Sequence, residues 1–251
     1  MAHLYYREDL SPQDFQLGSV IGLIGDEGRH AVRVSRLRVG EEISIGDGAG
    51  SVADGQVIRV DRDSCDIRVT QVRHARADAA VQLVLVQALA KGDRDERAVE
   101  QATEFGVDRI VPWQAQRSVS RWDDTKAARG VTKWQRVARE AAKQSLRARI
   151  PVVEDPVALA QLTAWASQPA THMLVLHPRG ERKLSQWCRE LQSPQGECVV
   201  VIGPEGGMSD AELTALASAG AEVLQLGDTV LRTSSAGPAA LVLLNQALQR
   251  W

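Results

Sequence analysis

The feature that most constrains the fold is a change of pattern near residue 80. Val81–Val86 is an almost uninterrupted apolar run, which is typical of a strand buried on both faces of a parallel sheet. After this run, predicted helices and strands alternate to the end of the chain. Such alternation indicates an α/β domain. We therefore expect a parallel α/β domain over residues 76–251, preceded by a segment of another kind.

Several helix and strand boundaries in this second part follow from capping residues. A helix that starts near Asp93 ends at Gly106, and Ser209 with Glu212 forms a capping box that starts another helix, which ends at Gly220. The remaining expected elements are strands at 109–112, 172–176, 198–202 and 223–226, and helices at 132–146 and 238–249.

Residues 1–75 instead contain short alternating segments and tight turns. Cys65–Val72 alternates at period two, as a half-buried strand does, and Gly46–Gly50 marks a turn. Several short strands without a long helix indicate a small β-barrel. The small, polar segment 74–80 is predicted to link the two domains.

Composition excludes several classes of protein. The 251 residues are 44% hydrophobic, which is typical of a folded chain, and no apolar run approaches the ~20 residues that a membrane span requires. The first ten residues lack an apolar signal region, and the three cysteines have no metal-ligand spacing. We expect a cytoplasmic protein without a metal and without membrane contact.

Positive charge is concentrated in the middle of the chain. The net charge is −2, but residues 81–150 carry 14 basic and 9 acidic side chains. Between Lys126 and Arg149 there are eight basic residues and one acid, which suits a phosphate backbone better than a mixed solvated face. A solvated face remains the alternative. Arg129, Lys133, Arg136, Lys143 and Arg147 recur at helical spacing and are expected on one face.

Two loops are candidates for a binding site. Gly203–Gly207 and Leu226–Ala236 each follow a predicted strand and precede a predicted helix, at the strand ends where α/β sheets bind ligands. An ordinary strand-to-helix turn is the alternative for each loop. The chain has no Walker lysine, Rossmann glycine pattern, GxSxG elbow or metal-ligand cluster, so other nucleotide-binding, hydrolase and metalloenzyme hypotheses lack support.

These loops, together with other segments, resemble the 16S rRNA uridine-N3 methyltransferases of the RsmE type, in the SPOUT superfamily. The resemblance covers nearly the whole chain, and the order and spacing of its motifs make it specific. The matching segments are His30–Gly40, Lys91–Arg94, Thr103–Val107, Arg117–Val119, Glu140–Arg147, Gly203–Gly207 and Leu226–Thr233.

The resemblance implies a fold, a reaction and partners. The fold would be a PUA-like β-barrel followed by a SPOUT-type parallel sheet with a C-terminal trefoil knot. The protein would be a homodimer that uses S-adenosylmethionine (SAM), releases S-adenosylhomocysteine, and methylates one uridine of 16S rRNA, within the small ribosomal subunit. SAM would be held by Leu176, His177, Ile202, Gly203, Pro204, Glu205, Gly206, Leu226, Gly227, Val230, Leu231 and Ala236.

The same resemblance, with the charge pattern, suggests catalytic and RNA-binding residues. Arg232 is the candidate for stabilising negative charge on the base, and Thr233 or Ser234 for relaying its proton. Ser234 and Lys143 each stand at a position where the family usually has glutamate. The expected RNA contacts are Arg33, Arg36, Arg38, Lys91, Arg117, Lys133, Arg136, Lys143 and Arg147.

Two other activities remain open at this point. A ribose 2′-O methyltransferase would deprotonate a hydroxyl group rather than the uracil imide. A non-catalytic RNA-binding assembly factor would leave the cofactor pocket without a role. A nucleotide-binding regulator fits the α/β pattern but not the basic segment.

Overall fold

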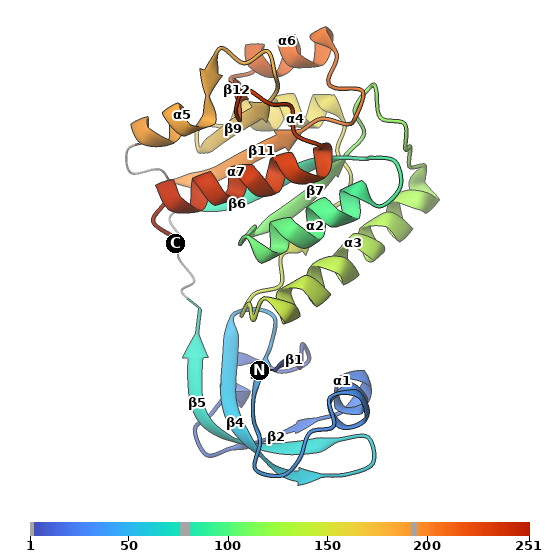
Figure 1. Cartoon of the computed structure of the whole chain (residues 1–251), viewed down its shortest axis with the longest axis vertical. Coiled ribbons are helices and arrows are strands. Elements are labelled where there is room, and N and C mark those ends of the chain that lie inside the picture. Colours follow the sequence, from blue (N-terminus) through green and yellow to red (C-terminus); the bar gives the residue numbers. More distant parts are fainter. Residues whose placement is uncertain (1–2, 76–80, 192–194) are drawn as a thin grey trace. The chain divides into compact units, whose positions relative to one another are not determined.

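The chain forms two compact units in a computed structural model that describes residues 3–75, 81–191 and 195–251 (Figure 1). One unit consists of residues 1–78 and 142–150, and the other of 79–141 and 151–251. Most of the linker predicted at 74–80 lies outside the described residues. The domain boundary after residue 75 stays a prediction.

The first unit is built on a mixed five-stranded sheet with the order β1-β3-β4-β5-β2, in which β1 and β3 are parallel and the other neighbours antiparallel. Cys65, Ile67 and Val69 are buried at every second position, as predicted for a half-buried strand. The elements are β1 (Leu4–Tyr6), η1 (Pro12–Asp14), β2 (Val20–Leu23), α1 (Gly25–Arg29), η2 (His30–Val34), β3 (Glu42–Gly46), β4 (Ser51–Val60) and β5 (Cys65–His74).

The second unit is built on a seven-stranded sheet with the order β10-β12-β9-β11-β6-β7-β8, in which every pairing is parallel. This confirms the predicted parallel α/β domain. Its elements are β6 (Val81–Ala88), α2 (Arg94–Glu104), β7 (Arg109–Trp113), α3 (Asp124–Gln144), β8 (Val152–Val153), α4 (Leu159–Ala166), β9 (Thr171–Leu176), β10 (Arg182–Lys183), α5 (Leu184–Glu190), β11 (Gly196–Ile202), α6 (Asp210–Ser218), β12 (Glu222–Gln225) and α7 (Thr233–Ala247).

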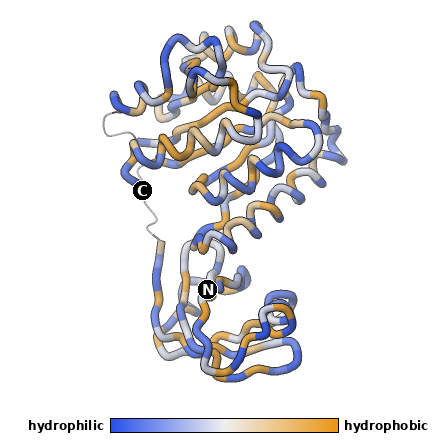
Figure 2. Tube along the Cα trace, in the orientation of Figure 1, coloured by the Kyte–Doolittle hydropathy of each residue, from blue (hydrophilic) through white to orange (hydrophobic). Residues whose placement is uncertain are grey.

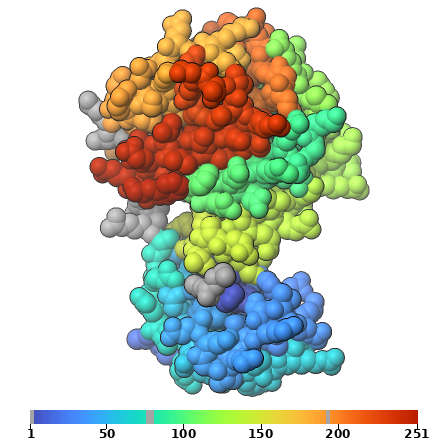
Figure 3. Space-filling model, viewed as in Figure 1, coloured from blue at the N-terminus to red at the C-terminus, as the bar shows by residue number. Residues whose placement is uncertain are grey.

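Strand β6 is buried on both faces, as its apolar sequence predicts. Leu83 and Leu85 belong to the cluster covered by α2, α3, α5 and α7, whereas Val84 and Val86 belong to the cluster covered by α4 and α6. Hydrophobic residues follow the central strands and α7 in Figure 2. Helices α2 and α7 lie side by side on one face of this unit (Figures 1 and 3). No described helix is long and apolar enough to cross a membrane.

Two helices begin earlier than the sequence predicts. Helix α3 starts at Asp124 rather than at 132, and α7 starts at Thr233 rather than at Pro238. Proline favours the first turn of a helix, which suggested a start at Pro238, but the preceding residues already have helical geometry. The residues predicted as catalytic therefore stand at the start of α7. The trefoil knot stays a prediction.

Lys143, at the end of α3, lies in a buried ionic cluster within the first unit. Its Nζ is 2.6 Å from Glu27 Oε2 and 3.2 Å from His30 Nδ1, and it lies 4.9 Å from the centre of the Tyr5 ring. The Lys143 side chain is only 7% exposed, and that of Glu27 12%. A phosphate would have to displace Glu27 to reach this lysine, because the helix end packs against α1. The basic face predicted along α3 is thus interrupted at Lys143.

We predict that Lys143→Met destabilises the protein by about 3 kcal/mol, because it removes the buried cation beside Glu27. The matched control is Lys133→Met, which breaks an ion pair with Glu96 in which the lysine side chain is 52% exposed and which should cost less than about 1 kcal/mol. Urea denaturation followed by circular dichroism measures both. Equal losses in the two variants would contradict a buried, stabilising ion pair.

Candidate cofactor and catalytic site

Three loops meet at the carboxyl ends of neighbouring strands. Strand β9 lies between β11 and β12, so the loops that follow these three strands emerge at the same edge of the sheet. They border a cleft made of two adjoining cavities of about 400 and about 320 Å³. The two cavities share six lining residues: Leu176, His177, Pro178, Val230, Leu231 and Ala236.

The residues predicted to hold the cofactor gather around this cleft, with one exception. Gly206 does not line it, but lies against Arg117, whose Cβ would be 3.1 Å from a Cβ added at the glycine. The structure thus brings together side chains from three loops, although their role as cofactor ligands stays a proposal. The predicted residues that line the cleft are Leu176, His177, Ile202, Gly203, Pro204, Glu205, Leu226, Gly227, Val230, Leu231 and Ala236.

Thr233 fixes the start of α7 to the floor of the cleft. Its hydroxyl group donates a 2.8 Å hydrogen bond to the Gly203 carbonyl and accepts a 2.9 Å bond from the Gln87 side-chain amide. Gln87 is fully buried at the end of β6. Because the hydroxyl proton of Thr233 is already donated to Gly203, this side chain suits a structural role better than the predicted proton relay. Sequence reasoning did not identify Gln87, which lies inside an apolar strand.

An ion pair ties the loop after β11 to the segment before α2. Arg94 Nη1 is 2.6 Å from Glu205 Oε1, and the backbone N–H of Lys91 donates to the same oxygen at 3.1 Å. Burial favours the neutral acid, but hydrogen bonds from Arg94 and backbone N–H groups prevail and lower the pKa of Glu205. Arg94 also lines the cleft. Arg94 was not among the predicted site residues, although its place in the Lys91–Arg94 segment could have indicated such a role.

Arg232 is an exposed cation at the edge of the cleft. It is the residue immediately before α7, and its guanidinium group makes no ion pair in the described part of the chain. The first N–H groups of a helix lack intrahelical acceptors and give that end a positive potential. Ser234 is half-buried and does not line the cleft. Arg232 and the start of α7 together therefore suit a substrate group that gains negative charge.

His177 contributes a neutral imidazole ring to the cleft. Its Nδ1 accepts a 3.2 Å hydrogen bond from the backbone N–H of Arg179. Burial, with a smaller contribution from nearby arginines, lowers the pKa of His177. The ring is therefore uncharged at neutral pH and can accept hydrogen bonds or pack against an uncharged ligand.

The predicted RNA-binding residues fall into distinct environments. Arg36, Arg38, Lys91 and Arg136 are exposed, and their side chains make no ion pair among the residues described. Arg33 pairs with Asp63, and Lys133 with Glu96. Arg117 donates weakly to the carbonyls of Gly206 and Met208, and Arg147 is half-buried in the first unit. Lys143 is buried and paired with Glu27, so its ammonium group is not accessible to a phosphate.

Comparisons with known proteins agree with this architecture. The profile of the RNA methyltransferase domain family matches residues 77–245, and that of the RNA methyltransferase PUA domain matches residues 23–70. The ribosomal RNA small subunit methyltransferase E of Mycobacterium tuberculosis is 37% identical over 255 aligned residues, covering all of this chain and 94% of that protein. The protein of the same name from Bacillus subtilis is 29% identical, over 92% and 91%.

A solved structure of another protein has the same fold over nearly the whole chain. A Legionella pneumophila protein, solved in complex with the bound cofactor SAM, shares 29% identity and a TM-score of 0.82, with 98% of each chain covered. Fold and cleft thus define an RNA methyltransferase domain that is combined with a PUA domain. The chain belongs to the family of the ribosomal RNA small subunit methyltransferases E.

We predict that Thr233→Val weakens cofactor binding and lowers stability by about 1–3 kcal/mol, because the buried Gln87 amide and Gly203 carbonyl lose a partner. The control is Thr125→Val at an exposed position of α3. Calorimetric SAM titration and thermal unfolding measure the two effects. If Thr233→Val binds SAM with wild-type affinity and unfolds at the wild-type temperature, Thr233 does not anchor the cleft.

We predict that His177 makes stability depend on pH below neutrality. Because folding lowers its pKa, its contribution is complete above the unfolded value near 6.5 and is lost as pH falls through the lower folded value. His177→Asn retains an acceptor for the Arg179 N–H but cannot titrate. Melting temperatures at pH 7.5 and 5.5 should differ less in the variant than in the wild type. An unchanged difference would show that other groups control this pH dependence.

Proposed function

We propose that the protein transfers a methyl group from SAM to N3 of a uridine in 16S rRNA. The observation that carries the proposal is the position of Arg232, an exposed cation on the edge of the cleft and directly before α7. Relatives named as small-subunit rRNA methyltransferases supply the substrate class. We further propose that the chain acts as a homodimer on RNA within the small ribosomal subunit.

The cleft fits SAM in size and chemistry. A cavity of about 400 Å³ that adjoins one of about 320 Å³ falls in the range of sites for molecules of this size. Apolar side chains such as Leu176, Ile202 and Leu231 suit an adenine ring, and the loop backbones offer polar groups. When bound, SAM supplies an electrophilic methyl group. S-adenosylhomocysteine would remain in the cleft after transfer.

Arg232 would act on the base rather than on the cofactor. Uridine N3 carries a proton and becomes nucleophilic when that proton leaves, so the site must favour the uracil anion. The Arg232 guanidinium is always protonated and unsuited to be the base, but it can stabilise this anion by charge and hydrogen bonds. The N-terminal end of α7, whose first residue lines the cleft, adds positive potential. Because Ser234 does not line the cleft, the proposed route for the proton is a solvent molecule between the base and the Ser234 hydroxyl group.

RNA contacts are proposed at exposed cations of both units. In the first unit these are Arg36 and Arg38, and in the second Lys91 and Arg136. Guanidinium and ammonium groups without protein partners bind phosphates at a lower desolvation cost than those already paired. Arg33, Lys133, Arg117 and Arg147 remain secondary candidates, since each has protein contacts to exchange or is partly buried.

We predict that the protein, incubated with SAM and undermethylated small ribosomal subunits, forms 3-methyluridine. Mass spectrometry of the digested RNA identifies the modified nucleoside. Formation of a 2′-O-methyl nucleoside would agree with SAM as the cofactor but would exclude methylation of uridine N3. Absence of both product and SAM binding would instead favour an assembly factor without catalysis.

We predict that Arg232→Ala lowers the single-turnover rate by roughly 10²–10³-fold, as removal of one preorganised donor to a developing anion does. SAM affinity should be unchanged, because the effect lies on the base. Arg232→Lys serves as the control, since it retains the charge without the planar guanidinium, and should lose less activity. A full rate in Arg232→Ala, with normal SAM and RNA binding, would remove this arginine from the mechanism.

A further inference from the structure

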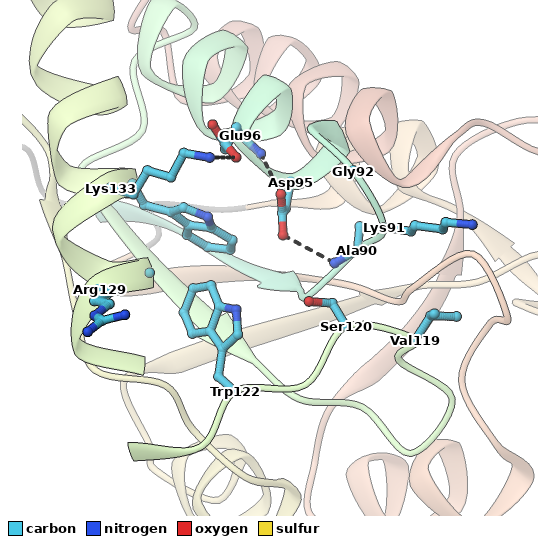
Figure 4. A pocket seen from close by; sticks show the side chains of 12 residues that line it. Ala90, Lys91, Gly92, Asp95, Glu96, Val119, Ser120, Trp122, Arg129 and Lys133 are labelled. Carbon is cyan, nitrogen blue, oxygen red and sulfur yellow. Dashed lines mark hydrogen bonds and ion pairs between the residues drawn. The ribbon is translucent and has the colours of Figure 1, made fainter. Parts of the chain in front are cut away.

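A second pocket lies on the other side of the Lys91–Arg94 segment from the cleft. It has a volume of about 450 Å³ and is bordered by the segment after β6, the start of α2, residues 119–122 and one side of α3. Figure 4 shows Trp122 and Ser120 facing Asp95 and Ala90 across this space. Nothing in the proposed transfer of a methyl group uses these side chains.

An aromatic surface dominates one wall of the pocket. The Trp122 ring packs edge-on against that of Trp134, with centroids 5.5 Å apart. Gly130 makes this possible, because a Cβ at that position would lie 2.4 Å from the Trp122 ring. The backbone N–H of Trp122 is held by the Gln114 side chain at 2.9 Å. The indole ring is therefore fixed in place before any ligand arrives.

The indole N–H groups in this wall lack protein acceptors. Elsewhere in the chain, the N–H groups of Trp113, Trp165 and Trp187 each donate to a carbonyl or carboxylate oxygen. Trp122 and Trp134 have no such bond among the described residues, and neither indole nitrogen is among the buried atoms without a partner, so both remain accessible. Trp N–H groups are hydrogen-bond donors, so a ligand with acceptor atoms can bind to these two.

The opposite wall is polar and fixed. Asp95 is 5% exposed, and its carboxylate accepts hydrogen bonds from the backbone N–H groups of Ala90 and Glu96. Each carboxylate oxygen retains a second acceptor site. Ser120 adds a hydroxyl group that faces Asp95 and Ala90 across the pocket (Figure 4). Donors and acceptors at the edge of a planar aromatic ligand could be recognised here.

Positive charge lines the mouth of the pocket. Arg129 is exposed and makes no ion pair within the described ranges, and the same holds for the Lys91 side chain. Lys133 is already neutralised by Glu96 at 2.5 Å. A ligand with one or two negative charges and an aromatic ring would complement this combination, and an unpaired nucleotide has both.

We propose that this pocket binds an unpaired nucleotide of the substrate RNA, its base stacked on Trp122 and its phosphate held by Arg129. The inference rests on the proposed action on RNA. The backbone of Lys91 contacts Glu205 of the cleft, and Arg94, which lines the cleft, is followed directly by Asp95 of the pocket, so one short segment borders both sites. One RNA strand can therefore present a target uridine to the cleft and a neighbouring base to the pocket.

Binding of single-stranded hexaribonucleotides of uridine and of adenosine tests this directly. In a ¹H–¹⁵N spectrum of the full chain, the indole signals of Trp122 and Trp134 should shift upon addition, whereas that of the exposed Trp251 should not. Trp122→Ala should weaken the affinity on the order of ten-fold, as loss of one base stack does. Trp251→Ala is the matched control and should bind as the wild type.

Arg129→Gln keeps the proposal testable if Trp122→Ala does not fold, because Arg129 is exposed and its replacement leaves the aromatic wall intact. This variant should bind the hexamers several-fold more weakly and with a smaller dependence on salt. SAM affinity should be unchanged in both variants. Wild-type affinity for the hexamers in both folded variants would overturn the proposal, and so would uridine monophosphate binding as tightly as the hexamers.

The test separates this inference from the proposed function. Wild-type protein is assayed in parallel for 3-methyluridine. If the indole signals shift but no 3-methyluridine forms, the result supports nucleotide binding in the pocket and contradicts the uridine-N3 reaction. If wild type, Trp122→Ala and Arg129→Gln form 3-methyluridine at equal rates at low RNA concentration, the result supports the uridine-N3 reaction. It contradicts the binding of an RNA nucleotide in the pocket.

Discussion

Two hydrogen bonds at the Thr233 hydroxyl join two segments that line the cleft to the buried end of β6. They join Gln87 at the end of β6, Gly203 in the loop after β11, and the first residue of α7. These segments are far apart in the sequence, and the bond from Gln87 is buried, whereas the bond to Gly203 is partly buried. A buried donor or acceptor left without a partner costs about 1–3 kcal/mol, so the arrangement has a strong preference for one geometry. Arg232, one residue earlier, is left exposed and free to contact a substrate.

The basic middle of the chain serves more than one purpose. Lys143 is buried beside Glu27 and stabilises the packing of the end of α3 within the first unit, and Lys133 is paired with Glu96. Arg129 and Arg136, on the same helix, are exposed and have no ion pair in the described structure. The number of basic residues in this segment predicts that it binds phosphate groups. Which of these side chains can do so depends on whether each is exposed and free of an ion pair with the protein.

Much of the second unit could be predicted from sequence, because its central strands are apolar on both faces. The position of the cleft also followed, since carboxyl ends of parallel strands meet at one edge. Helices α4 and α5 were missed because their N-caps are Ala158 and Lys183, which make no side-chain cap, whereas α6 begins with the capping residue Ser209. The sequence alone also suggested too late a start for α7, because Pro238 resembles a first-turn proline.

Tertiary contacts account for what the sequence could not reveal about the site. Lys143 looked like a surface cation because its partner, Glu27, is distant in the chain. Gln87 stands in an apolar strand and gave no signal of a contact with α7. The aromatic pocket required Trp122 and Trp134 to be recognised as neighbours, which depends on the loop that precedes α3 and on the absence of a side chain at Gly130.

The role proposed for Arg232 is to stabilise the uracil anion from which N3 attacks. It is tested most directly by replacing the target uridine with 5-fluorouridine, whose electron-withdrawing fluorine makes the N3 proton more acidic. Single-turnover methylation is then compared between wild type and Arg232→Ala on both RNAs. The account predicts that fluorination speeds the variant much more than the wild type, because an anion that forms more readily needs less stabilisation. An Arg232→Ala protein that is equally slow on both RNAs, while the wild type is equally fast on both, would contradict it.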